Sequence, residues 1–306
     1  MDFYAEGIRE YPHTYTLEKL QQYIQDETIL ESRALAFGAD RALHFALGNI
    51  PAIMPYEECA DGVREGKVRD IALLTRVGRS VCFMVTELRQ ENDGKVVAIL
   101  SRAKSQQRCK QRYLDHLIPG DILSCRVTHI EPFGAFCDVG CGISALLPID
   151  CLSVSRISSP ADRIQVGQDI RCILKGRDEE GRLILSLKEL LGTWIENASQ
   201  FSAGEAVIGI VRSCEDYGVF IELAPNLVGL AEPNTELQRG QVVSVYIKSI
   251  LPPRMKIKLV VLSCLENSEV RLPLSYFYDG KHLSSWQYSY PDNNHKIETI
   301  FDAPTE

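Results

Sequence analysis

The sequence of 306 residues lacks any run of about eighteen apolar residues, the length that a membrane-spanning helix needs. A secretory signal is also missing, because the opening MDFYAEGIREYPHTYTLEKL has neither a basic start nor an apolar core. We therefore expect a cytoplasmic protein that has no membrane partner.

Cysteine pairs of the CxxC type are absent, although the chain has 10 cysteines. The nearest group is Cys137, Cys141 and Cys151, which offers three thiols where structural zinc takes four ligands in tighter pairs. Free cysteines that fill the core of a protein in a reducing compartment are the simpler explanation. No metal and no other cofactor is expected.

Catalytic motifs are missing as well. The sequence has no phosphate-binding GxxxxGK, no HExxH, no nucleophile elbow and no dinucleotide fingerprint. Its 6 histidines are scattered and pair with no carboxylate at a catalytic spacing. The sequence therefore predicts a binding protein and not an enzyme.

The net charge of −8 lies entirely in the two ends of the chain. Residues 1–28 carry two basic and six acidic side chains, residues 263–306 carry three and seven, and residues 29–262 balance to zero. Within the balanced part, residues 101–117 form a basic stretch. The acidic total is compatible with a nucleic-acid partner, because the position of charge matters more than its sum.

A pattern of five short alternating strands recurs along the chain. Residues 118–190 show it most clearly, from GDILSCRVTHIEPFGAFCDVG to GRLILSLKEL; it returns over residues 203–262 and, more weakly, over residues 29–100. Alternation alone would also suit a sandwich. The reuse of one five-stranded unit with the same turns favours OB-fold barrels, in which one face receives oligonucleotides.

The predicted fold class is mainly β, with tandem five-stranded OB-fold barrels joined by short helices. The predicted order is an N-terminal helical extension (1–28), a degenerate first copy (29–100), a basic linker helix (101–117), a middle copy (118–190), a linker (191–202), a last copy (203–262) and an aromatic-rich acidic extension (263–306).

Two segments, EPFGAFCDVG and EDYGVFIEL, each place two aromatic rings around a glycine. In the first, strand alternation turns Ala135 and Cys137 inward and leaves Phe136 and Asp138 outward. The bend at the glycine lets Phe133 share the outer face. Rings buried in the core are the alternative, but the alternation favours exposed rings that can stack on bases.

These segments, together with ALLPI, VGQDIRCIL, GLAEP and RGQVVSVYI, resemble the S-one RNA-binding domain, the OB-fold module named after bacterial ribosomal protein S one. The resemblance covers about three quarters of the chain and is strongest in the middle copy. It implies binding of single-stranded RNA on one face of each intact barrel.

In the middle copy, the resemblance implies that Phe133 and Phe136 stack on bases and that Asp178 and Arg182, on the last hairpin, contact RNA. Pro148 stands where the family has a histidine, so that contact is absent. Further basic candidates near this face are Arg126, His129, Lys175 and Arg177.

In the last copy, Tyr217, Phe220 and Lys256 match the family's pattern. Glu232 stands at the histidine position, where it would repel phosphate, and prolines 252 and 253 occupy the acidic corner. We therefore expect the last copy to bind RNA more weakly than the middle one.

The first copy departs furthest from the family. Aligning Gly48 with Gly140 places His44 at the position of Phe136 and no ring at the position of Phe133. We expect this copy to have lost RNA binding. The resemblance implies that it can instead dock on the small ribosomal subunit or on another protein.

Two further features leave alternatives open. Lys104, Arg108 and Arg112 share one face of the linker helix, which is either a solvated face or an extension of the phosphate track. Residues 276–290 hold six aromatics between turn signals and predict a hairpin that packs on the last barrel, with a second stacking platform as the alternative. Near the N-terminus, Thr16 can cap a short helix.

The sequence thus predicts a non-catalytic protein that binds single-stranded RNA, with mRNA as the partner and a role in translation. Two alternatives remain open. One is a protein-interaction scaffold, because aromatic rings also serve protein interfaces well. The other is an accessory subunit in RNA turnover or transcription.

Overall fold

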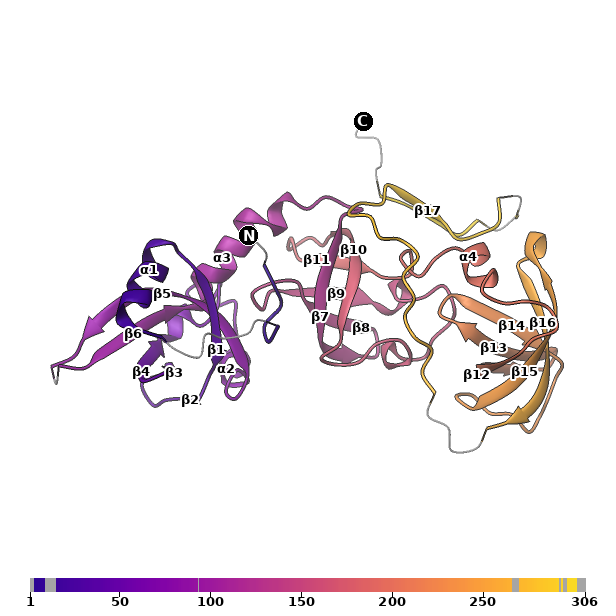
Figure 1. The fold of residues 1–306 in the computed structure, drawn as a ribbon, viewed down its shortest axis with the longest axis horizontal. Coiled ribbons are helices and arrows are strands. Elements are labelled where there is room, and N and C mark those ends of the chain that lie inside the picture. Colours follow the sequence, from indigo (N-terminus) through magenta and orange to yellow (C-terminus); the bar gives the residue numbers. More distant parts are fainter. Residues whose placement is uncertain are drawn as a thin grey trace. The chain divides into compact units, whose positions relative to one another are not determined.

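The computed structural model describes residues 3–8, 15–92, 94–265, 270–291, 293 and 296–301. The chain divides into two compact units (Figure 1). The first comprises Met1–Leu117 with Asp138–Ser144, and the second comprises Ile118–Cys137 with Ala145–Glu306. In the described part of the chain, no helix is long and apolar enough to cross a membrane.

The first domain is a six-stranded sheet in the order β1-β5-β6-β4-β3-β2, with short helices around it. Its elements are α1 (Leu17–Gln25), β1 (Ile29–Arg33), β2 (Ala36–Phe37), β3 (Leu43–Leu47), β4 (Ile50–Met54), α2 (Asp70–Leu74), β5 (Ser80–Gln90), β6 (Val96–Ser101) and α3 (Arg102–Arg112), with 3-10 turns at Tyr56–Glu58 and Leu114–His116.

β1 and β2 lie at the two edges of this sheet and are consecutive in the chain. Between them, Ala34 N–H donates to the Arg79 carbonyl and Leu35 N–H donates to the His44 carbonyl. The backbone thus turns from the β5 side to the β3 side within two residues. The two pieces act as one bent first strand, so the strand order is that of an OB fold.

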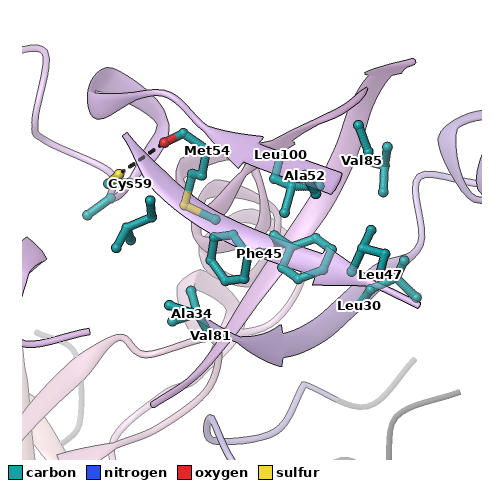
Figure 2. Close-up of a cluster of buried hydrophobic side chains, with 14 of the residues drawn as sticks. Leu30, Ala34, Phe45, Leu47, Ala52, Met54, Cys59, Val81, Val85 and Leu100 are labelled. Atoms are coloured by element: carbon teal, nitrogen blue, oxygen red, sulfur yellow. Dashed lines mark hydrogen bonds between the residues drawn. The ribbon is translucent and has the colours of Figure 1, made fainter. Parts of the chain in front are cut away.

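The core of the first domain lies inside this sheet (Figure 2). Phe45 on β3 and Phe83 on β5 are buried with their ring centroids 5.7 Å apart. Leu20 of α1 adds a fully buried side chain, and the Thr16 hydroxyl caps that helix by accepting from Lys19 N–H at 3.3 Å. The capping follows the sequence prediction.

The second unit contains two closed barrels with the same cyclic strand order. The middle barrel consists of β7 (Ile122–Glu131), β8 (Gly134–Asp138), β9 (Ser144–Pro148), β10 (Asp169–Arg177) and β11 (Leu183–Ser186), with 3-10 turns at Ile149–Cys151 and Pro160–Asp162. The last barrel follows α4 (Trp194–Ala198) and consists of β12 (Ala206–Glu215), β13 (Gly218–Ala224), β14 (Leu227–Ala231), β15 (Val242–Leu251) and β16 (Lys256–Cys264), with a 3-10 turn at Pro252–Arg254. The prediction of tandem OB-fold barrels is confirmed.

A β-bulge occurs at the same place in all three domains, on the fourth strand where it pairs with the fifth. The register skips Thr86 in the first domain, Lys175 in the middle barrel and Lys248 in the last barrel. A bulge leaves one residue outside the regular pairing and re-aims its side chain. Lys175 and Lys248 are therefore equivalent residues on the two barrels.

The C-terminal segment, yellow in Figure 1, runs past both barrels of the second unit and ends in the two-stranded sheet of β17 (Ser285–Gln287) and β18 (Glu298–Ile300). Trp286 and Tyr288 are buried in the core of the last barrel, as the sequence predicted. Tyr276 and Tyr278 pack instead beside Phe301 on the core of the middle barrel. The segment therefore contacts both barrels and not the last one alone.

One alternation prediction is wrong. Asp138 was expected to point outward, but it is buried with 4% exposure in the first unit. Its carboxylate accepts hydrogen bonds from the backbone N–H groups of Gly140 at 2.9 Å, Gly142 at 3.0 Å and Glu6 at 2.8 Å. Hydrogen bonds from a turn and from the distant N-terminal segment account for this burial, and strand periodicity cannot reveal them.

Candidate nucleic-acid interface

Each barrel of the second unit carries one pair of perpendicular rings. In the middle barrel, Phe133 and Phe136 have ring centroids 6.1 Å apart and an interplanar angle of 87°. In the last barrel, Tyr217 and Phe220 are 5.9 Å apart at 86°. The same edge-to-face arrangement is therefore built twice from different sequences.

The rings lie outside the barrel cores. Phe133 is 55% exposed and Tyr217 is 68% exposed, and their partners Phe136 and Phe220 are half-buried. The inward positions are filled instead by small and aliphatic side chains: Ala135 and Cys137 in the middle barrel and Val219 and Ile221 in the last. Exposed rings on a small soluble barrel are available for stacking.

A glycine between the two rings allows the close approach of another strand. A methyl group added at Gly134 would lie 2.6 Å from the Leu147 carbonyl oxygen at the end of β9. A methyl group at Gly218 would lie 2.5 Å from the Ala231 carbonyl oxygen at the end of β14. The glycine is thus required for packing against the third strand, which brings the ring-bearing turn close to that strand's end.

His129 adds a third ring to the middle barrel. It stacks near Phe136, with centroids 6.4 Å apart and planes 22° from parallel. Its Nε2 lies 2.7 Å from a carboxylate oxygen of Glu131. The sequence had marked His129 only as a basic candidate, and its role as a neighbour of the stacking ring depends on the pairing of β7 with β8.

Two basic candidates of the middle barrel, Arg182 and Arg126, are paired with carboxylates. Arg182 donates to Asp178 at 2.7 Å and lies 3.1 Å from Glu180; its hydrogen bond is the main reason that the pKa of Asp178 lies below its usual value. Arg126 makes a two-fold contact with Asp169 at 2.7 and 2.8 Å. These exposed pairs reduce the positive charge that the barrel presents to a phosphate.

The other two basic candidates of this barrel are also engaged. Lys175 donates to the Cys151 sulfur at 3.2 Å. Arg177 has an interaction partner as well. The structure therefore brings the two rings and Arg182 to one barrel, but with the cations already partnered.

The last barrel presents a different set of charges. Lys256, which the sequence identified, is exposed. Lys258, on the same strand β16, and Lys248, on the neighbouring strand β15, are also exposed, and the sequence had not identified them. The alternation in KIKL, with Ile257 and Leu259 buried, was the available signal for Lys258.

The first domain has no ring pair at the equivalent position. The pairing of Leu43 with Met54 matches that of Val219 with Ala231, which places Arg41 where the last barrel has Tyr217. The Arg41 guanidinium lies 4.1 Å from the centre of the Tyr56 ring and 3.2 Å from Asp70. The Arg41 guanidinium thus packs against the Tyr56 ring, at the position where the other barrels carry a stacking ring.

The linker helix keeps little of its predicted positive face. Arg102 is buried and donates to Glu6 at 2.7 Å. Arg108 is largely buried and paired with Glu27, and the Lys110 ammonium lies 2.6 Å from Asp61. Lys104 and Arg112 are exposed. Of the three residues predicted to share one helix face, Arg108 is therefore engaged in an ion pair within the first unit. The solvated-face interpretation suits the remaining two residues.

The middle barrel belongs to a known class of module. The sequence profile of the S1 RNA binding domain matches residues 117–188, which enclose β7 to β11. This is the S-one domain whose motifs the sequence displays. The chain belongs to the family of proteins that carry S1 RNA-binding domains.

Two relatives are both named small ribosomal subunit protein bS1. The protein of Staphylococcus aureus (strain COL) is 30% identical over 210 residues, which are 63% of this chain and 53% of the relative. That of Staphylococcus epidermidis is 30% identical over 243 residues, 74% of this chain and 59% of the relative. The chain spans little more than half the length of these relatives.

Among solved structures, a multidomain protein with nucleic acid binding domains from Streptococcus pneumoniae aligns with 77% of this chain and 73% of its own, at 15% identity and a TM-score of 0.26. A likeness at this level supports no inference about function.

Proposed function

We propose that the chain is a non-catalytic protein that binds single-stranded RNA through its middle and last barrels. The observation that carries the proposal is the exposed perpendicular ring pair, which recurs on both barrels with nearly the same geometry. Unpaired bases expose flat faces that stack on such rings, and each stacked base contributes about 1–3 kcal/mol. Two ring pairs are therefore sufficient for binding that tolerates many sequences.

The role that fits this activity is in translation, with mRNA as the RNA and the cytoplasm as the place of action. The likeness to bS1 proteins and the S1 profile over residues 117–188 support this assignment. The first domain, whose equivalent surface is occupied by the Arg41 and Tyr56 contact, is proposed to dock on the small ribosomal subunit or on another protein and not to bind RNA.

The site residues that we propose are the two ring pairs and a set of charged side chains on the same barrels. Phe133 and Phe136 stack on bases in the middle barrel, as do Tyr217 and Phe220 in the last barrel. The phosphate and base-edge contacts involve Asp178, Arg182, Lys175 and Arg126 in the middle barrel and Lys256 in the last.

A titration with fluorescent single-stranded RNA tests the proposal. In the full chain, the double substitution Phe133→Ala/Phe136→Ala should weaken binding by roughly 10-fold or more, because each lost stack costs about 1–3 kcal/mol. The matched control is Tyr56→Ala, which removes a ring from the first domain and should leave the affinity unchanged. A double variant that is folded and binds as tightly as the parent would show that the rings do not carry the binding.

A duplex of the same sequence separates stacking from simple charge attraction. Paired bases cannot reach the rings, so the duplex should bind more weakly than the single strand at the same salt concentration. Equal affinity for both would favour a surface that reads only the phosphate backbone.

A further inference from the structure

The charged side chains of the hairpin formed by β15 and β16 in the last barrel are all basic. Between Val242 and Cys264 the sequence contains four basic residues and no acidic one. The four are Lys248, Arg254, Lys256 and Lys258. A hairpin with this composition presents a positive surface wherever its side chains point outward.

All four of these side chains are exposed. None of them makes a hydrogen bond or an ion pair with another residue that the structure describes. Lys256 and Lys258 alternate with the buried Ile257 and Leu259, so both lie on the outer face of β16. The cations of this hairpin are therefore available to a ligand.

The register places Lys258 in line with the stacking ring Phe220. Phe220 on β13 pairs with Leu230 on β14, and Leu230 pairs with Lys258 on β16. All three side chains point outward, since their neighbours Ile221, Ala231 and Leu259 are buried. Two strand spacings separate Phe220 from Lys258, or about 10 Å. A base stacked on Phe220 thus has a cation within reach of its own or the next phosphate.

The bulge places Lys248 beside the same row. The register between β15 and β16 skips Lys248, between the pairs of Ile247 with Leu259 and Ser249 with Lys258. Lys248 is the equivalent of Lys175 in the middle barrel, and both are exposed. Lys175 donates to the Cys151 sulfur, whereas Lys248 has no hydrogen bond or ion pair with a residue that the structure describes.

The corresponding hairpin of the middle barrel is neutral. Residues 169–186 contain four basic and four acidic side chains. Its charged residues form ion pairs: Arg126 with Asp169, Arg171 with Asp279 at 3.2 Å, and Arg182 with both Asp178 and Glu180. At the position of Lys258 this barrel has Ile184, which pairs with Leu146. The two barrels therefore have similar rings and different charges.

We propose that the β15–β16 hairpin is the main phosphate-binding surface of the chain, with Lys248 and Lys258 as contacts beside Lys256. The inference rests on the proposed binding of single-stranded RNA. Base stacking would involve both barrels, whereas most of the salt-dependent attraction to phosphate would come from the last one. By the parallel register of β14 and β16, the residue after Ala231 lies toward Val260, so Glu232 is beyond Lys258 along the strands and away from Lys256.

The test is the salt dependence of RNA affinity, measured on the full chain with a fluorescent single-stranded oligonucleotide. For single strands, each phosphate contact contributes about 0.7 to the slope of log affinity against log salt. The variant Lys248→Gln/Lys258→Gln should reduce the slope by about 1.4, as expected for two lost contacts. The variant Lys175→Gln/Arg182→Gln in the middle barrel should reduce it by less than half of that amount.

Two controls make the result specific. Lys104→Gln/Arg112→Gln removes two exposed charges from the linker helix and should leave the slope unchanged, whereas Lys248→Arg/Lys258→Arg keeps the charge and should retain the parent slope. The proposal is overturned if the hairpin variant has the parent slope, or if the linker variant lowers it equally. Loss of binding in Phe133→Ala/Phe136→Ala reports on RNA stacking separately, so a failed hairpin result leaves the proposed function standing.

Discussion

Arg163 and Glu222 form a buried ion pair between the middle and the last barrel. Arg163 follows the 3-10 turn at Pro160–Asp162, and Glu222 lies on β13. One guanidinium nitrogen is 3.0 Å from the carboxylate and the second nitrogen contacts the other oxygen, with side-chain exposures of 1% and 0%. The contact is bidentate, which fixes the orientation of the guanidinium relative to the carboxylate as well as their distance.

A second arginine and an asparagine complete this interface. Arg212 Nε donates to Glu222 at 2.7 Å from within the last barrel. Asn226 donates to the Lys188 carbonyl at 2.8 Å and accepts from Val154 N–H at 2.9 Å. Because these groups are buried and paired, the two barrels form one compact unit.

Replacing Glu222 with alanine should lower the free energy of unfolding of the second unit by about 3–5 kcal/mol, because Arg163 and Arg212 would remain buried without their shared carboxylate. The measurement is urea unfolding followed by tryptophan fluorescence. The chain has 2 tryptophans, Trp194 and Trp286, and both lie in the core of the last barrel.

The matched control is Asp279→Ala, which breaks the exposed pair with Arg171 in the same unit. An exposed pair contributes about 0–1 kcal/mol, so this variant should unfold at nearly the parent urea concentration. A Glu222→Ala midpoint as close to the parent as the control would mean that the buried pair adds little to the stability of the unit.

Gly134→Ala should destabilise the middle barrel by about 1–3 kcal/mol, because the new methyl group would press against the Leu147 carbonyl oxygen and force the strands apart. Gly176→Ala is the control in the same barrel, since a methyl group there meets no atom within 4 Å. Hydrogen exchange of β8 and β9 measures the difference. Equal protection in the two variants would contradict a packing role for Gly134.

The sequence predicted the parts of the interface that depend on local periodicity. The inward positions of Ala135 and Cys137 and the outward position of Phe136 follow from alternation along one strand. The repeat of five strands follows from the spacing of the turns, and its weak first copy was still recognisable although its first strand is split into β1 and β2.

The sequence could not predict features that depend on pairing between distant segments. The alignment of Lys258 with Phe220 requires the parallel register of β14 and β16. The neutralisation of Arg126 by Asp169 requires the pairing of β7 with β10. Motif matching weighs residue types and not their partners, so it could not show that the cations of the middle barrel are paired with carboxylates.

Asp138 provides a pH-dependent contribution to the stability of the first unit. Burial is the main reason that the pKa of its carboxyl rises to about 6, and the negative charge of Glu6 adds to the shift. Burial would also raise the pKa of Glu6, but the guanidinium of Arg102 outweighs it and holds that pKa below the usual value. The two carboxyls therefore titrate in different pH windows.

Between about pH 4.5 and about pH 6, folded Asp138 retains a proton that the unfolded chain, with a pKa of about 3.9, has largely released. The folded state then binds more protons than the unfolded state, so stability falls as pH rises through this window and levels off above it. Glu6 acts in the opposite direction and only at lower pH, because its stabilising charge is lost as pH falls through its lowered pKa.

Hydrogen exchange of Val139 and Ile143, whose backbone groups pair across the turn at 3.0 Å, measures this local stability at pH 4.5, 5.5, 6.5 and 7.5 after correction for the intrinsic rate. Protection should decline between the first and third points and then remain constant. Asp138→Asn should abolish the decline, because the amide does not titrate, whereas Asp61→Asn should retain it. A carboxyl carbon resonance of Asp138 with its midpoint near pH 4 would contradict the burial argument directly.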